Sequence, residues 1–484
     1  MILIAALLTS LAIGFALTRL LSPHTGAGLP DVMLTLSLAI TSGLGLSSLL
    51  IFICLAFANG NVKGESISAV VLALVLVGLA WIRNRSGQSP PTPWPPAPRM
   101  PWLAAAFCLA ALAAAATFIL LTLHSPYGSG WDALDSYNQH ARFMFLGREH
   151  WKDVFSAMEV GWSPGYPPLT AGAIAHCWFF VGRESLVVPS AIGFLFSVAV
   201  VGLLASSLCL LRSASQGLIA GIVLLCSPKF VEEAARQYAD VPLAAFYLGA
   251  VLLLCLHDAL QSGSGWLVMS GMTAGMAAWT KPEGLMFVAV LVLARFVVIG
   301  VSRGLRAWAR EFVPFCLGLL PVLTVVLYFK FRVVGAPSDL VVGQTPHAFL
   351  TRLLTVSRYF VIAKAFAKQL IGFGDWAVTL SPLLLMYLLV TGIRRARKDR
   401  LAIYTASLTL LLVMSGYFMV YVLTPHDLAW HLNTSLDRLV MQIWPLALFT
   451  FFMLARTPEE VSTWSAVSES CSPSQAAAVP LMSK

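Results

Sequence analysis

The chain has 484 residues, of which 58% are hydrophobic and 11% are charged, and its mean hydropathy is +0.82. Apolar runs without charges recur from residue 2 to residue 455, which excludes a soluble globular protein and indicates one membrane-embedded helical unit. The net charge of +9 lies mainly in short loops between these runs, as in the cytoplasmic loops of membrane proteins, so it does not indicate a nucleic-acid partner.

The N-terminal part of the sequence contains three apolar runs, at 2–21, 32–58 and 67–82. The first run has no basic flank and no small-residue cleavage site, so we expect it to be kept as a membrane span. The proline-rich stretch at 90–98 follows and is expected to be stiff. Residues 1–100 are therefore predicted to form a three-span element that ends in a proline-rich cytoplasmic connector.

Further apolar runs follow along the chain. The convincing ones are 102–123, 186–211, 238–256, 312–330, 376–393, 401–423 and 438–455, and the weaker ones are 167–182, 213–228, 266–279 and 284–300. Basic loops at 83–99, 303–310 and 394–400 are expected in the cytoplasm, which makes 124–166 a long external loop. An odd number of spans must then separate 166 from 303, so one of the six runs between them does not cross.

The run at 167–182 is the best candidate for the segment that fails to cross, because it is short and begins with two prolines. We expect it to be re-entrant or interfacial. The predicted fold is all-α and polytopic, with about 13 transmembrane helices, an external N-terminus, and the long external loop between the fourth and fifth spans. The tail at 456–484 lacks apolar periodicity and is predicted to be a disordered cytoplasmic segment.

Two acids in the external loop are candidates for chemistry. Asp132 and Asp135 are three residues apart at the expected start of a helix, which would place both carboxylates on one face. An ionised carboxylate there can act as a general base on a hydroxyl group, although both residues could simply be helix-start residues. The pair could also hold a divalent cation, but no complete set of ligands is visible.

Three more polar clusters are expected on the same external face, at 236–240, 281–283 and 426–438. Each of them could cap a helix or form an ion pair. Arg295 interrupts an apolar run, and we expect its side chain to extend to the cytoplasmic headgroups. The eight cysteines show no metal or disulfide spacing, and the absence of P-loop, HExxH and usable GxSxG motifs disfavours nucleotide-driven transport and zinc proteolysis.

The motifs WDALDSYN, YPPL, QYADVPLA, WTKPEG and DLAWHLNTSLDRLVMQIWP follow one another in this order. Together they resemble the GT-C superfamily of membrane glycosyltransferases, in the branch related to protein mannosyltransferases and the aminoarabinose transferase of lipid A. The resemblance covers 102–455 and predicts a GT-C-like catalytic membrane domain at 101–455. It implies a polyprenyl-phosphate-linked sugar donor and a catalytic acid in the first long external loop of this domain.

Individual residues take expected roles from this resemblance. Asp132 matches the catalytic acid best, and Asp135 is the second candidate. The family often has an adjacent Asp-Glu pair, whereas these acids are three apart, so the resemblance leaves the choice between them open. The other matches comprise expected donor-phosphate ligands, namely Lys281, Arg438 and His431, and expected cavity-lining residues, namely Tyr166, Asp240, Glu283 and Asp427.

The resemblance implies transfer of a sugar to a lipid, glycan or protein acceptor on the extracytoplasmic face, with inversion and an aspartate base. The expected location is a bacterial inner (plasma) membrane, and no cofactor beyond the divalent cation is indicated. One alternative is a polymerase or ligase that uses a lipid diphosphate. Another is a transporter or flippase of lipid-linked sugars, which is disfavoured because no inverted repeat is visible and the polar clusters gather on one face.

Overall fold

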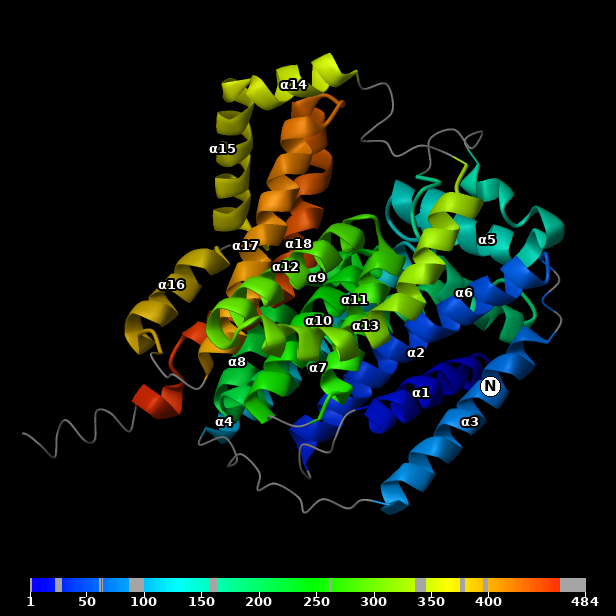
Figure 1. The fold of residues 1–484 in the computed structure, drawn as a ribbon, viewed down its shortest axis with the longest axis horizontal. Coiled ribbons are helices and arrows are strands. Elements are labelled where there is room, and N and C mark those ends of the chain that lie inside the picture. Colours follow the sequence, from blue (N-terminus) through cyan, green and yellow to red (C-terminus); the bar gives the residue numbers. More distant parts are fainter. Residues whose placement is uncertain are drawn as a thin grey trace, which may run out of the picture.

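The computed structural model describes residues 2–21, 28–60, 62, 64–86, 100–156, 163–260, 263–335, 345–374, 379–394 and 399–461. Within these ranges the regular structure is helical, apart from one isolated bridge between Ile393 and Ala455 (Figure 1). The predicted all-α membrane fold is therefore confirmed. The predicted connector at 87–99 lies outside the described residues.

The N-terminal element consists of α1 (Ile2–Leu21), α2 (Leu29–Phe57) and α3 (Glu65–Ser86). Helices α1 and α2 touch backbone to backbone, because a Cβ atom at Gly14 would lie 2.0 Å from the Ala39 carbonyl oxygen. The element also packs on the rest of the molecule. Ser48 of α2 donates a hydrogen bond to the Pro168 carbonyl oxygen at 3.2 Å and accepts one from the Trp279 indole at 3.1 Å.

Proline and glycine mark the ends of several helices. Proline stands at the first or second position of four helices, where its missing N–H costs nothing, and glycine in the left-handed region ends another at Gly182. The elements are α4 (Pro101–His124), η1 (Asp132–Asn138), α5 (Gln139–Leu146), η2 (Arg148–His150), η3 (Asp153–Phe155), α6 (Leu169–Val181), α7 (Val187–Leu211), α8 (Ala214–Leu225), α9 (Pro228–Ala235), α10 (Asp240–Leu260), α11 (Gly265–Thr280), α12 (Glu283–Arg303), α13 (Leu305–Tyr328), η4 (Phe329–Val333), α14 (Pro346–Leu354), α15 (Val356–Gly372), α16 (Leu380–Thr391), α17 (Arg400–Leu423) and α18 (Leu428–Leu454).

Ten described helices are long and apolar enough to cross a membrane, or eleven if the bent pair α8 and α9 forms one span. The bend between α8 and α9 is 63°. Helices α6 and α16 are apolar but shorter. The prediction of 13 spans thus stays a prediction.

Helix α6 corresponds to the run that was predicted not to cross. Its 13 residues extend about 20 Å, less than the roughly 30 Å of a bilayer core. Segments before and after α6 contact the same external loop. The Tyr166 ring lies 6.5 Å from the Tyr137 ring, and Glu184 pairs with Arg142 at 2.8 Å. The prediction that this run does not cross the membrane stays a prediction.

The run predicted as a span at 376–393 is built differently. Only α16 is helical there, and α15 precedes it along the same side of α17 and α18 (Figure 1). Arg358 of α15 donates to the Tyr421 carbonyl oxygen at 3.0 Å near the end of α17, and Arg394 after α16 donates to the Leu454 carbonyl oxygen at 2.9 Å. The two short helices α15 and α16 therefore lie one after the other along α17 and α18, where a single span at 376–393 was expected.

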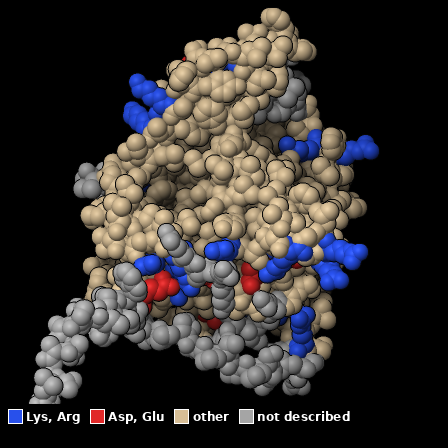
Figure 2. Space-filling view, turned by 60° about the vertical axis from the view of Figure 1, so that its left-hand side comes forward, with Lys and Arg blue, Asp and Glu red and all other residues tan. Residues whose placement is uncertain are grey.

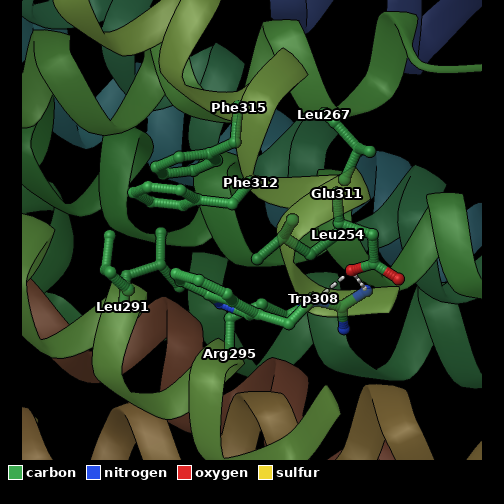
Figure 3. Close-up of a pocket in the computed structure, with 9 residues that line it drawn as sticks. Leu254, Leu267, Leu291, Arg295, Trp308, Glu311, Phe312 and Phe315 are labelled. Atoms are coloured by element: carbon green, nitrogen blue, oxygen red, sulfur yellow. Dashed lines mark hydrogen bonds and ion pairs between the residues drawn. The ribbon is translucent and has the colours of Figure 1, made fainter. Parts of the chain in front are cut away.

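Arg295 was expected to extend to the headgroups, but its side chain is buried inside the protein. It is 6% exposed and donates to both carboxylate oxygens of Asp258, at 2.8 and 2.7 Å, and to Glu311 at 3.0 Å. Figure 3 shows its head beside Glu311, in a pocket that Trp308 and Phe312 also line. The two carboxylates compensate the charge of the buried guanidinium. The sequence does not reveal this pairing, because the three charges are far apart along the chain.

Figure 2 shows a broad band without charged side chains across the face in view, with Lys and Arg above and below it and Asp and Glu mainly below it. After α16, Arg394 pairs with Asp399 at 3.2 Å and with Glu460 at 3.4 Å. The predicted disorder of 456–484 is therefore wrong for its first six residues, and 462–484 lie outside the described residues.

A glycine contact between α11 and α13 gives a prediction for stability. A Cβ atom at Gly318 would lie 1.8 Å from the Val268 carbonyl oxygen, so the two helices would have to separate. We expect Gly318→Ala to lower the free energy of unfolding by about 2 kcal/mol, measured as thermal unfolding in detergent. Gly78→Ala is the matched control, because nothing lies within 4 Å of that added carbon. Equal stability of the two variants would contradict the close packing.

Candidate active site

Asp240 is the centre of a polar cluster that joins the loop at 124–166 to three helices. It begins α10 and is fully buried. Its Oδ1 accepts hydrogen bonds from Lys281 at 2.9 Å and from Gln442 at 2.6 Å, while its Oδ2 accepts from the Arg438 Nε and Nη2 at 3.1 and 2.9 Å. With no exposed surface, Asp240 holds two cations in place. Its predicted cavity-lining role stays a prediction.

Arg438, ten residues into α18, connects Asp240 to the external loop. Its Nη2 lies 2.6 Å from the Asp132 Oδ2, and its guanidinium carbon lies 4.5 Å from the centre of the Tyr238 ring. The side chains of Arg438 and Asp132 are 16% and 30% exposed. A substrate can therefore reach this cation and this carboxylate from outside.

Lys281 lies between α11 and α12, behind Arg438. Its side chain is 4% exposed, and its ammonium group is 3.5 Å from Glu283 and 5.7 Å from the centre of the Tyr166 ring. Burial lowers the pKa of Lys281, but the nearby Asp240 and Glu283 carboxylates outweigh burial and hold this pKa well above its usual value. The lysine therefore stays charged at physiological pH.

Three tyrosines pack around these charges. Tyr137 and Tyr238 form a buried cluster with Ala133, against which Tyr166 packs. Burial raises the pKa of all three phenol groups, so they remain neutral hydroxyls. Gly130 permits this packing, because a Cβ atom there would lie 1.9 Å from the Tyr238 hydroxyl oxygen. This close approach explains one glycine of the Gly-Ser-Gly stretch that opens the loop motif.

Asp132 and Asp135 do not share a face, which corrects the prediction from their spacing. Residues 132–138 form the π-helix η1, whose hydrogen bonds close over five residues, so side chains three apart no longer align. Asp132 contacts Arg438, whereas Asp135 lines a separate pocket with Arg142 and Glu184. The two acids thus have different surroundings in the structure, although the sequence gave no reason to choose between them.

Two other predicted residues lie apart from the cluster. His431 is two helical turns, about 10 Å, before Arg438 on α18, and its Nδ1 is 2.9 Å from the Thr424 hydroxyl. Asp427 is the N-cap of α18 and accepts a hydrogen bond from the Trp430 backbone at 2.8 Å. His431 and Asp427 therefore make their hydrogen bonds away from Lys281 and Arg438, and their predicted roles stay predictions.

Two features of the site were missed from the sequence. Gln442 stands one helical turn after Arg438, and its carbonyl oxygen accepts from the Tyr417 hydroxyl at 2.6 Å. Its position four residues after Arg438 within an apolar run could have indicated that both side chains lie on one face of the helix. Lys229 joins α9 to α18 through Asp437 at 2.5 Å and also pairs with Glu233 at 3.0 Å. No local pattern connects these distant residues.

His140 of α5 gives the loop a predictable pH dependence. It is buried against Phe155, and burial lowers its pKa to about 3. The folded state keeps it neutral, whereas the unfolded chain protonates it below about pH 6.5, so its contribution to stability falls as the pH falls from 6.5 towards 3. Between about pH 6.5 and 5 we expect the wild type to lose about 2 kcal/mol that His140→Gln does not lose.

The measurement for His140 is the thermal unfolding midpoint at pH 7 and pH 5. His150→Gln is the control, because that side chain is 72% exposed and its removal should leave the acid sensitivity unchanged. Parallel pH profiles for the wild type and His140→Gln would contradict the buried neutral histidine.

The cluster offers a reachable carboxylate, a reachable guanidinium and a buried ammonium group, a set suited to proton abstraction beside a departing anion. Among the described residues, no three His, Cys, Asp or Glu side chains are grouped so that they could hold a metal ion. The divalent cation considered from the sequence therefore has no ligand set in the described part of the chain.

Comparison with known families identifies the class of protein. Residues 167–329, about a third of the chain, match the family model described as dolichyl-phosphate-mannose-protein mannosyltransferase. The match confirms the resemblance to the GT-C superfamily, and the segment that contains Asp240, Lys281 and Glu283 carries this domain. The match covers less than half of the chain and supports a membrane glycosyltransferase of the GT-C type. Comparison with curated proteins and with solved structures gives no match.

Proposed function

We propose that the protein moves a sugar from a polyprenyl-phosphate donor to a lipid, glycan or protein acceptor on the extracytoplasmic face, with Asp132 as the base. The observation that carries this proposal is the 2.6 Å contact between Asp132 and Arg438. It places a reachable carboxylate beside the cation that a donor phosphate would meet.

The donor phosphate binds at Arg438. Guanidinium groups are good phosphate ligands, and this one is fixed on its inner side by Asp240. Lys281 lies behind it and stabilises negative charge without direct contact, because its side chain is almost fully buried. A phosphate competes with Asp132 for Arg438, so donor binding frees the carboxylate for the acceptor.

The reaction then proceeds by a single displacement. The acceptor hydroxyl gives its proton to the Asp132 carboxylate, and its oxygen bonds to the anomeric carbon of the sugar. The bond from that carbon to the phosphate oxygen breaks, and the electron pair leaves with the polyprenyl phosphate. Arg438 stabilises the charge that develops on this leaving group. Attack from the face opposite the phosphate inverts the anomeric configuration.

Oriented membrane vesicles test the function and its side. A short-chain polyprenyl-phosphate sugar that cannot cross the bilayer should be consumed by right-side-out vesicles and yield a sugar covalently joined to an acceptor. Inverted vesicles should yield none. Product formed only by inverted vesicles would overturn the proposed side, and sugar that enters the lumen still on its carrier would indicate transport.

A further inference from the structure

A pocket of about 660 Å³ with mixed polar and apolar walls lies beside the candidate active site and takes no part in the proposed reaction. Its walls include Tyr127, Asp135, Asn138 and Arg142 from the external loop, and Pro189 from the start of α7. We call it the head pocket. The π-helix η1 separates it from Arg438, because Asp132 faces Arg438 and Asp135 faces the pocket.

Unpartnered groups of the head pocket indicate the chemistry of its ligand. The Asp135 Oδ2 and the Asn138 Oδ1 are buried and accept no hydrogen bond. The one cation among the lining residues, Arg142, is paired with Glu184 at 2.8 Å. A carboxylate in the pocket wall suits a hydroxyl-bearing group, whereas a phosphate would bring only further acceptors.

An apolar groove, also of about 660 Å³, lies next to the head pocket along the same two helices. Pro189 of α7 lines the head pocket, and Phe194 and Ser197 line the groove about 8 and 12 Å further along that helix. On α4, Ala115 and Phe118 line the groove, and the chain reaches the head pocket just beyond the end of that helix. The head pocket thus lies above the apolar groove.

The groove opens sideways towards the bilayer. Three of its lining residues, Leu36, Leu112 and Val198, are 49%, 69% and 45% exposed. They come from α2, α4 and α7, helices that all pass the criteria for membrane spans. A hydrocarbon chain is the one occupant that a bilayer supplies directly to such a groove.

We propose that the head pocket and the groove together bind the acceptor, and that this acceptor is a glycolipid. The uncharged sugar head occupies the pocket, with hydroxyl groups that donate to Asp135 and Asn138, and a hydrocarbon chain fills the groove. Binding of this lipid does not depend on the proposed function, whereas its role as the acceptor does. A head group must extend around a helix about 10 Å across to reach Asp132, so a simple alcohol is too small.

This site gives the N-terminal element a role in substrate binding. Leu36 and Ile40 of α2 form one wall of the groove, opposite α4. The family match covers neither helix, since it begins at residue 167. Specificity for the lipid therefore comes in part from segments outside the matched domain.

Photo-crosslinking of the full-length protein in phosphatidylcholine nanodiscs tests the proposal. The probe is a hexosyl diacylglycerol with a diazirine in one acyl chain, and the comparison probe is phosphatidic acid with the same chain. We expect the glycolipid to label peptides of α4 and α7 at least about fivefold more than phosphatidic acid does, which corresponds to roughly 1 kcal/mol. The labelling is done in Asp132→Asn without donor, so it does not depend on transfer.

Matched variants locate the labelling. Ala115→Trp fills the groove and should reduce labelling at least about fivefold. Ala116→Trp, the neighbouring position that does not line the groove, should leave it unchanged. Asp135→Asn should reduce labelling by the glycolipid and not by phosphatidic acid. Equal labelling by both probes, or no effect of either Ala115→Trp or Asp135→Asn, would overturn the proposal even if donor cleavage is intact.

Discussion

Replacing Asp132 with asparagine is expected to abolish sugar transfer in a protein that folds normally. The amide has the size of the carboxylate but cannot take a proton from the acceptor hydroxyl, and loss of a general base costs about 10²–10⁴-fold in rate. The fold should persist because Arg438 keeps the Asp240 carboxylate as its buried partner. Initial rates of transfer and thermal unfolding of the same preparation measure the two effects.

Asp153→Asn is the control for this prediction. Asp153 lies in the same external loop, and its side chain is 62% exposed and 3.2 Å from His150, away from the cluster. The same substitution there should leave the transfer rate within about twofold of the wild type, since surface changes have small effects. Transfer by Asp132→Asn at the rate of this control would remove Asp132 from the mechanism.

The second large effect is expected for Asp240→Asn. This change leaves Lys281 without its closest carboxylate and removes the inner partner of Arg438. Removing one member of a buried ion pair typically costs 3–5 kcal/mol, so we expect a loss of about 3 kcal/mol in the free energy of unfolding together with loss of transfer. Thermal unfolding and transfer assays measure both.

Two comparisons make the prediction for Asp240 specific. Asp427→Asn, the same change at an exposed N-cap, should alter stability by only a few tenths of a kcal/mol, because asparagine caps helices as well as aspartate does. Adding Lys281→Met to Asp240→Asn should recover part of the lost stability without restoring transfer, because no unpaired ammonium group is then buried. Full stability of Asp240→Asn alone would contradict the role of Asp240.

The helical architecture and the gathering of the site on one face could be predicted from the sequence. Long apolar runs fix which segments are buried in a bilayer, and the basic loops fix which of their ends meet. These two signals bring Asp132, Asp240, Lys281 and Arg438 to one side, and the structure joins them by direct contacts. The need for an odd number of spans between 166 and 303 also pointed to 167–182 as the run that does not cross, and the structure has only a short helix there.

The separation of Asp132 from Asp135 could not be predicted in the same way. Spacing by three assumes an α-helix, and a single π-helical turn changes which way each side chain points. His431 and Asp427 lie near Arg438 in sequence, but their hydrogen bonds go to Thr424 and to the α18 backbone. The head pocket and the groove arise only where α4, α7 and α2 pack together, and no local pattern encodes that packing.

The most direct test is to identify the carrier that purified protein releases from a polyprenyl-phosphate sugar in the presence of membrane lipids. We predict polyprenyl monophosphate in equal amount to the sugar transferred, inverted anomeric configuration in the product, and no release above background by Asp132→Asn. Release of a diphosphate carrier, retained configuration, or undiminished release by Asp132→Asn would contradict the proposed transfer.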